Sequence, residues 1–189
     1  MKKILLIGGG GHAHSVIDVI ENNKEFDIAG IVDSERENSK DVLGYPILGG
    51  DGDIEKLLID IPHAIVSIGQ IKSANIRKDL FELLKRFGAK IPNIFSKNAY
   101  VSKRSFFETG CVVMHGAVVN SGVKIGHNVI VNNMALIDHN VKIGDHTHIS
   151  TGARINGDIS IGAECFIGSG EIIKQGVKTG AKSFISAGS

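Results

Sequence analysis

Residues 125–155 read IGHNVI VNNMAL IDHNVK IGDHTH ISTGAR I, and an aliphatic residue opens each group of six. The step continues in both directions: of the fifteen positions at this spacing from Val101 to Ile185, fourteen are apolar and the other is Thr179. Four residues after each stands, in most repeats, a small or β-branched residue such as Ala135 or Ala153. A period of six is typical of a β-helix, in which three sides of six residues make a coil of about 18. Residues 101–189 would then form about five coils, with one large and one small residue per side pointing inward.

The same six-residue period leads to two further predictions. Cys111 and Cys165 are 165 − 111 = 54 residues apart, or three coils, so they should point inward on the same side. Their separation would be about 14 Å at the spacing of neighbouring strands, whereas the Cα atoms of a disulfide lie within about 7 Å. We therefore expect two small core residues. Several repeats also have a glycine directly after the aliphatic residue, where we expect a corner without room for a side chain. These glycines are Gly126, Gly144, Gly162, Gly168 and Gly180.

The first half of the chain has a different pattern. Short apolar runs at residues 4–7, 28–32 and 64–68 are typical of buried parallel strands. Val16, Val19 and Ile20 recur at helical spacing between the first two runs. A second helix should bury Ile76, Leu80, Leu83, Leu84 and Phe87 on one face and end at Gly88. We therefore predict a small α/β, Rossmann-like domain over residues 1–95 and a β-helix domain over residues 96–189.

Composition excludes several classes of protein. The chain has 189 residues, a net charge of +1, 42% hydrophobic and 22% charged residues, which gives no electrostatic reason to expect a nucleic acid or an anionic membrane as partner. No apolar run approaches the roughly 20 residues that span a bilayer, and residues 4–7 are too short for the core of a signal peptide. Two cysteines do not make a disulfide framework. We expect a cytoplasmic protein.

Repeats of the form IGDHT (143–147) and IGAEC (161–165) resemble those of the left-handed β-helix acyltransferases. The stretch VNNMALIDHNVKIG (131–144), with GGGGH (8–12) and GYPILGG (44–50), is more specific. It looks like the sugar O-/N-acetyltransferases that include the bacterial sialic acid O-acetyltransferases and the N-acetyltransferases of UDP-4-amino-4,6-dideoxy sugars. The resemblance runs through both halves of the chain. It implies a left-handed parallel β-helix, acetyl-CoA as co-substrate, and a homotrimer with acetyl-CoA in the cleft between neighbouring prisms.

His139 is the candidate catalytic base. Acetyl transfer requires a base that takes a proton as the nucleophile attacks the thioester, and histidine titrates in the suitable range. His139 stands two residues after an inward aliphatic position, where it can face a groove between prisms. Without the motif, a solvated surface histidine would be the better interpretation. Many relatives have an acid after this histidine, but this chain has Asn140, which can orient the ring and cannot supply a negative charge.

The resemblance implies three further contacts with acetyl-CoA, at His148, Ser169 and Ala187. For Ser169 and Ala187, ordinary packing at a corner is an equally simple interpretation.

The glycine loop is the candidate nucleotide site. Gly8-x-Gly10-x-x-Ala13 follows a strand and opens a helix, and Asp33 ends the next strand, as in a dinucleotide-binding fingerprint. Backbone N–H groups at such a helix start favour a phosphate. NAD is disfavoured because the domain has only about 95 residues, roughly one mononucleotide half, and no hydride-transfer domain follows. A tight turn without a ligand is the simpler alternative.

In the resembling family the same loop holds the pyrophosphate side of a UDP-sugar. The residues that match its substrate-binding positions are Gly10, Gly11, His12, Asp33, Ser34 and Gly69.

A metal site is a weaker alternative. Left-handed β-helices carry zinc in the γ-class carbonic anhydrases, but no two histidines here have the five-residue spacing of two of those ligands. We therefore expect no metal.

The sequence favours an acetyl-CoA-dependent acetyltransferase acting on the 4-amino group of a UDP-linked amino-deoxysugar. Two alternatives stay open: O-acetylation of a sialic acid-like sugar, and a non-catalytic nucleotide-sugar-binding homologue.

Overall fold

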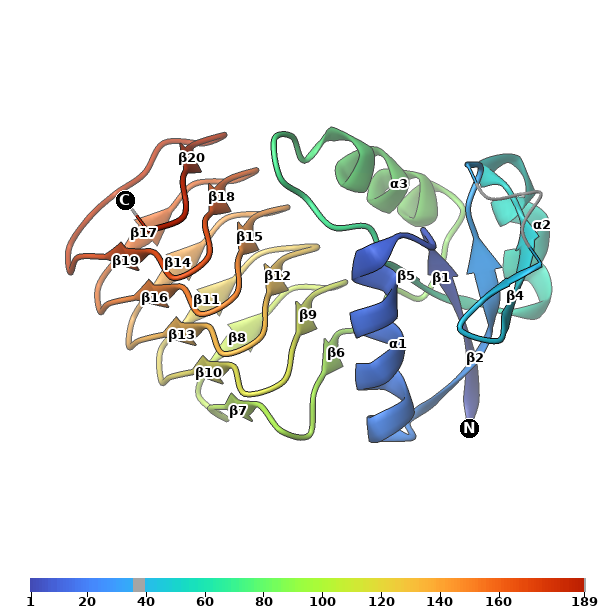
Figure 1. Ribbon diagram of the computed structural model, residues 1–189, viewed down its shortest axis with the longest axis horizontal. Helices are drawn as coiled ribbons and strands as arrows, with labels where there is room; N and C mark the ends of the chain where they lie inside the picture. The colour runs from blue at the N-terminus through green and yellow to red at the C-terminus, as the bar shows by residue number, and fades with distance from the viewer. Residues whose placement is uncertain (36–39, 189) are drawn as a thin grey trace. The chain divides into compact units, whose positions relative to one another are not determined.

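In the computed structural model, which describes residues 1–35 and 40–188, the two patterns of the sequence form two compact units. One unit consists of Met1–Gly69 and Ile76–Pro92, and the other of Gln70–Asn75 and Asn93–Ser189. Figure 1 shows the first unit as helices around a sheet and the second as a stack of coils made of very short strands. The α/β pattern and the β-helix pattern are thereby both confirmed.

The first unit is built on a five-stranded sheet in the order β3-β4-β2-β1-β5. All neighbours in it are parallel except β3 and β4. Its strands are β1 (Lys2–Ile7), β2 (Phe26–Val32), β3 (Asp41–Val42), β4 (Tyr45–Gly49) and β5 (His63–Val66). Because β1 lies between β2 and β5, the carboxyl ends of the three strands meet at one edge of the sheet.

The helices of this unit are α1 (Gly11–Asn23), α2 (Ile54–Asp60) after the short 3-10 helix η1 (Asp51–Asp53), and α3 (Asn75–Arg86). Helix α1 buries Val16, Val19 and Ile20 as predicted.

Helix α3 corrects one prediction. It ends as expected, with Gly88 in the left-handed region and the N–H of Ala89 donating to Leu84 O. Its buried face, however, carries Arg77, Leu80, Phe81 and Leu84, and Ile76 is 65% exposed. The expectation that Ile76 belongs to the core was wrong, because the face of α3 that is buried is rotated toward Arg77 and Phe81.

The second unit is a three-sided left-handed parallel β-helix made of two-residue strands. One side contains β7 (Tyr100–Val101), β10 (Val118–Val119), β13 (Leu136–Ile137), β16 (Arg154–Ile155) and β19 (Ile172–Ile173). The next side contains β8 (Phe106–Phe107), β11 (Lys124–Ile125), β14 (Lys142–Ile143) and β17 (Ser160–Ile161). The last side contains β6 (Ile94–Phe95), β9 (Val112–Val113), β12 (Ile130–Val131), β15 (His148–Ile149), β18 (Phe166–Ile167) and β20 (Phe184–Ile185).

The coil has the predicted length of 18. Ile137, for example, pairs with Val119 on one side and Ile155 on the other. The inward positions form one apolar column in which Ala135, Val141 and Ile149 are fully buried. Cys111 and Cys165 are buried and unpaired with each other, as predicted.

From Gly110 to Gly188, every sixth residue lies in the left-handed region, at the corners of the prism. Gly152 has a φ of +67° there, and Asn140 and Asp158 have φ values of +59° and +58°. The glycines that follow the inward aliphatic residues serve a different purpose. A Cβ on Gly144 would lie 2.5 Å from the backbone N of Ala163 in the next coil, so Gly144 is required by the close stacking of coils.

Candidate active site

His139 lies at the corner between β13 and β14, with its side chain 50% exposed. Its Nδ1 is 3.4 Å from Asn140 Nδ2 and 3.9 Å from Asp158 Oδ2. Asn140 also donates from Nδ2 to Asp158 Oδ1 at 3.1 Å. The ring lies close to Gly157, where a Cβ would come within 2.4 Å of its Cε1. The histidine is thus held at Nδ1, and one face of its ring is set against a glycine.

Asp138 stabilises the same turn from the other side. Its Oδ1 accepts hydrogen bonds from the backbone N–H of His139 at 2.8 Å and from Asn120 Nδ2 at 3.1 Å. The backbone N–H of His139 lowers the pKa of Asp138; slight burial opposes the effect, and the Asn120 amide adds to the lowering. Asp138 is therefore a carboxylate at neutral pH and fixes the backbone that carries His139.

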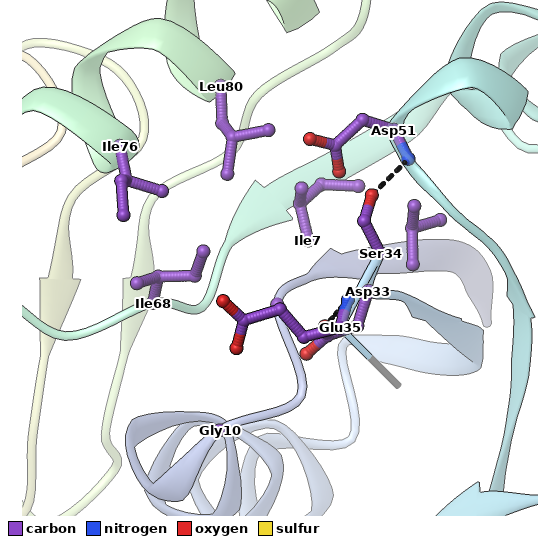
Figure 2. A pocket seen from close by; sticks show the side chains of 11 residues that line it. Ile7, Gly10, Asp33, Ser34, Glu35, Asp51, Ile68, Ile76 and Leu80 are labelled. Atoms are coloured by element: carbon purple, nitrogen blue, oxygen red, sulfur yellow. Dashed lines mark hydrogen bonds between the residues drawn. The ribbon is translucent and has the colours of Figure 1, made fainter. Parts of the chain in front are cut away.

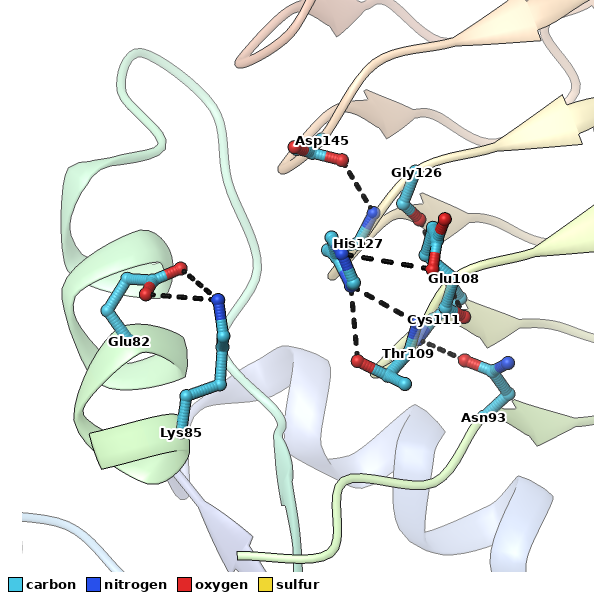
Figure 3. A network of polar contacts seen from close by, with 9 residues as sticks. All are labelled: Glu82, Lys85, Asn93, Glu108, Thr109, Cys111, Gly126, His127 and Asp145. Carbon is cyan, nitrogen blue, oxygen red and sulfur yellow. Dashed lines mark hydrogen bonds and ion pairs between the residues drawn. The ribbon is translucent and has the colours of Figure 1, made fainter. Parts of the chain in front are cut away.

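Each of the other histidines of the β-helix has at least one ring nitrogen in a polar contact. His127 Nδ1 is within 3.3 Å of the Thr109 backbone N–H, and its Nε2 is 3.9 Å from Glu108 (Figure 3). His115 Nδ1 is 2.6 Å from Ser96 Oγ. His146 is buried, with Nδ1 3.1 Å from Asn128 Nδ2. His139 differs from these four histidines in its exposure, because its side chain is half exposed and theirs are buried or partly buried.

The three predicted acetyl-CoA residues share one side of the prism and its following corner. His148 on β15 is 6% exposed, and its Nδ1 lies 2.9 Å from Gln70 O. Its Nε2 is 3.3 Å from Asn132 Nδ2. Ser169 follows β18 and Ala187 follows β20, one coil apart, and both are exposed. His139 lies at the corner opposite this side, so the four residues do not meet in one copy.

In the α/β unit, the glycine loop joins β1 to α1 as predicted, with Gly10 at the N-cap. The Gly9 N–H donates to Asp33 Oδ2 at 2.7 Å, and the Ser67 hydroxyl donates to Gly8 O at 2.6 Å. Asp33 thus lies beside the loop, and one of its carboxylate oxygens accepts a hydrogen bond from a loop N–H.

A cavity of 320 Å³ opens beside this loop at the carboxyl ends of the strands. Three of the six predicted substrate-binding residues line it, namely Gly10, Asp33 and Ser34, whereas Gly11, His12 and Gly69 do not. Gly69 instead faces His12, since a Cβ on Gly69 would lie 3.3 Å from His12 Cβ.

The wall of this cavity combines acids and aliphatic side chains. Figure 2 shows Glu35 and Asp51 facing Ile68, Ile76 and Leu80 across the cavity, with Asp51 N donating to Ser34 Oγ at 3.0 Å. No lysine or arginine is found among the described residues that line it. Carboxylates accept hydrogen bonds from sugar hydroxyls and base N–H groups, so this wall suits a nucleoside better than a phosphate. Ile76, exposed on α3, is therefore an apolar part of this wall.

Sequence reasoning missed two residues of the candidate catalytic corner. Gly157 and Asp158 stand 18 residues after His139 and Asn140, so the coil length alone could have placed them there. Within the described ranges, no group of three or more His, Cys, Asp or Glu side chains is placed to hold a metal ion. No helix in that part of the chain is long and apolar enough to cross a membrane.

The family model for the PglD N-terminal domain matches residues 3–84. The acetyltransferase domain of PglB from Neisseria gonorrhoeae, solved with acetyl coenzyme A, is 30% identical, with 99% of this chain and 89% of that chain covered and a TM-score of 0.87. A second structure of that domain gives 29% identity, 100% and 90% coverage and a TM-score of 0.93. No curated protein sequence matched the chain.

A variant of perosamine N-acetyltransferase from Caulobacter crescentus, in which a histidine is replaced by asparagine, was solved with CoA and GDP-perosamine. It is 26% identical, with 94% of this chain and 91% of that chain covered and a TM-score of 0.80. The fold and these matches define an acetyltransferase of the hexapeptide β-helix class. Within that class, the chain belongs to the sugar acetyltransferases, which confirms the resemblance noted in the sequence.

Proposed function

We propose that the protein transfers the acetyl group of acetyl-CoA to the 4-amino group of a UDP-linked amino-deoxysugar, with His139 as the general base. The observation that carries this proposal is the His139 corner, where a half-exposed imidazole is held at Nδ1 and lies against Gly157. The relatives solved with acetyl-CoA, or with CoA and a nucleotide-linked amino sugar, support the choice of reactants.

The chemistry follows from that arrangement. The sugar amine attacks the thioester carbonyl, and Nε2 of His139 takes a proton from the nitrogen as the C–N bond forms. The tetrahedral intermediate then collapses, the C–S bond breaks, and the sulfur leaves as CoA thiol with the proton from the imidazolium. Backbone N–H donors of the coils would stabilise the oxyanion.

We propose that the active protein is a homotrimer. His139 and the group formed by His148, Ser169 and Ala187 lie on opposite parts of one prism, with the apolar column between them. A second copy can bring its own Ser169 and Ala187 beside the first copy's His139. The side that contains β13 also presents exposed apolar side chains, including Tyr100 at 60% and Ile172 at 53%, which a neighbouring copy would cover. A direct contact of His148 with acetyl-CoA would require Gln70 to move away from Nδ1.

The cavity beside the glycine loop is the proposed nucleotide site. Gly10 lies at the start of α1, where backbone N–H groups can approach a phosphate. Asp33, Ser34, Glu35 and Asp51 offer acceptors to the ribose and the base. Gly11, His12 and Gly69 would act through the shape of the turn. The nucleotide carried by the Caulobacter enzyme is GDP, so UDP and GDP sugars must be tested side by side.

Release of CoA thiol tests the proposal. We would compare a UDP-4-amino-4,6-dideoxy sugar, GDP-perosamine and sialic acid as acceptors, with the wild type, His139→Ala and the matched control His127→Ala. His139→Ala should lower kcat roughly 10²–10⁴-fold while nucleotide affinity and the His127→Ala rate stay near wild type. Equal rates for wild type and His139→Ala would remove His139 from the mechanism. Thiol release with sialic acid alone would favour O-acetylation, and UDP binding without release would favour a non-catalytic homologue.

A further inference from the structure

Asp158 faces the ring of His139 from the adjacent coil. Its Oδ2 lies 3.9 Å from His139 Nδ1 and accepts a hydrogen bond from Gln175 Nε2 at 3.3 Å. Its Oδ1 accepts a hydrogen bond from Asn140 Nδ2 at 3.1 Å. Residues of three successive coils thus hold this carboxylate at the proposed catalytic corner.

We infer that Asp158 is the positioning residue of His139, and that it supplies from the next coil the negative charge that Asn140 cannot provide. The inference rests on the proposed function, since it concerns how the proposed base is kept in its reactive form. The separation of 158 − 140 = 18 residues is one coil, which explains how an acid distant in sequence reaches the same ring.

The tautomer of His139 is the first reason. To accept a proton at Nε2, the neutral ring must carry its hydrogen at Nδ1, and that hydrogen needs an acceptor. The nearest group, Asn140 Nδ2, is a donor, and turning the amide around would set Asn140 Oδ1 against Asp158 Oδ1. The carboxylate of Asp158 is therefore the acceptor that favours a proton on Nδ1. Substrate binding can shorten a contact of 3.9 Å as the reactive complex forms.

The charge of Asp158 is the second reason. The imidazolium formed during the reaction is stabilised by a carboxylate nearby. Asp138, on the same turn as His139, directs its Oδ1 to the backbone N–H and to Asn120. Among the described residues, Asp138 and Asp158 are the acids in contact with His139. Asp158 is the one paired with the ring nitrogen.

The corner geometry makes a charge exchange possible. Asn140 and Asp158 both lie in the left-handed region, with φ of +59° and +58°. Asn and Asp tolerate this conformation better than other residues with a side chain. An amide and a carboxylate can therefore trade places between the two positions while the backbone keeps its course.

The test uses the full-length enzyme and three variants: Asp158→Asn, the exchange Asn140→Asp with Asp158→Asn, and Glu164→Gln. Glu164 has a φ of +60° at another corner and pairs with Lys182, so Glu164→Gln is a matched loss of charge away from His139. The readouts are kcat, KM for acetyl-CoA, and the pH dependence of kcat/KM measured by CoA thiol release.

Asp158→Asn should lower kcat roughly tenfold with little change in KM, and should move the acidic limb of the profile down by about 0.5–1 pH unit. The exchange variant should recover most of kcat and return the limb toward its wild-type position. Glu164→Gln should behave as wild type. A purely structural role of Asp158 would leave the limb in place and would not be rescued by the exchange.

The outcomes separate the inference from the proposed function. If the wild type is active and His139→Ala is not, an Asp158→Asn variant with unchanged kcat and pH profile would overturn the inference alone. Failure of the exchange variant to recover, with its circular dichroism spectrum and unfolding midpoint unchanged, would also overturn it. A wild type that releases no thiol with any acceptor would instead overturn the proposed function.

Discussion

The two units of this protein assemble their candidate sites in different ways. In the β-helix, residues 18 apart come together: the Asn140 side chain donates to Asp158, and the backbone N–H of Cys111 donates to Asn93 Oδ1. In the α/β unit, the contacts follow strand order and have no common interval: Gly9 meets Asp33, and Gly8 meets Ser67. A repeating frame allows one corner to vary while its neighbours keep the same backbone. At the sheet edge of the described α/β unit, these contacts are not repeated at equivalent positions.

This repetition predicts that truncating an inward side chain of the β-helix lowers the free energy of unfolding by an amount that depends on how many coils flank the residue. Ile137 is fully buried, and its strand β13 pairs with β10 and β16. Ile137→Ala should lower the free energy of unfolding by about 2–5 kcal/mol. Ile185 occupies the equivalent aliphatic position in β20 at the end of the stack and is only partly buried. Ile185→Ala should cost less than half as much.

Urea unfolding followed by circular dichroism measures both variants, with the wild type alongside. Equal losses would show that the terminal coil is covered as fully as the central ones, which would break the link between coil number and stability.

Glycines sharpen the comparison between the units. A Cβ on Gly144 would meet backbone atoms of the next coil, including Ala163 N at 2.5 Å, and a backbone in a stacked coil cannot easily move. Gly144→Ala should therefore lower the free energy of unfolding by about 2–3 kcal/mol. On Gly10 a Cβ would meet nothing within 4 Å. Gly10→Ala should cost less than about 1 kcal/mol.

The two variants should separate in a second measurement. If Gly10 makes room for a phosphate, Gly10→Ala should weaken nucleotide-sugar binding measured by calorimetry, whereas folded Gly144→Ala should bind it as the wild type does. A Gly10 variant that is badly destabilised yet binds normally would assign this glycine to folding.

Most of the β-helix could be predicted from the sequence because the repeat length also determines which residues contact one another. Positions such as Ile137 and Cys165 could be placed inward without knowing anything about the rest of the chain. The Asp158–His139 contact was missed, although the coil length of 18 residues places Asp158 in the coil next to His139. Its recognition depends on which corner side chains turn toward each other, and that direction is set by the left-handed backbone at residues 140 and 158.

The α/β unit was harder to predict in detail. The strands, the glycine turn and the neighbourhood of Asp33 followed from local patterns. The buried face of α3 did not: Arg77 and Phe81 are buried, and Ile76 is exposed beside the cavity. An apolar residue that lines a cavity has the same character as one that lines the core, so periodicity alone cannot separate them.

The smallest predicted effect concerns His63 on β5, which belongs to the α/β unit. Burial lowers the pKa of His63, and the charges of Lys90 and Lys2 lower it further, while a hydrogen bond with the backbone of Lys3 opposes the shift. Because the pKa is lower in the folded state, the unfolded chain binds more protons once the pH falls below about 6.5. His63 therefore contributes stability above that pH, and the contribution is lost as the pH falls through the folded-state pKa.

His63→Gln should flatten the decline in unfolding free energy between about pH 7 and pH 5, by less than about 1 kcal/mol after screening by solvent. Urea titrations of the wild type and His63→Gln at several pH values measure the difference, with His127→Gln in the β-helix as the matched control. A decline that is the same with and without His63 would locate the acid sensitivity elsewhere. A decline that disappears in the His127 variant instead would place it in the β-helix, and the α/β unit would then be the less pH-sensitive of the two.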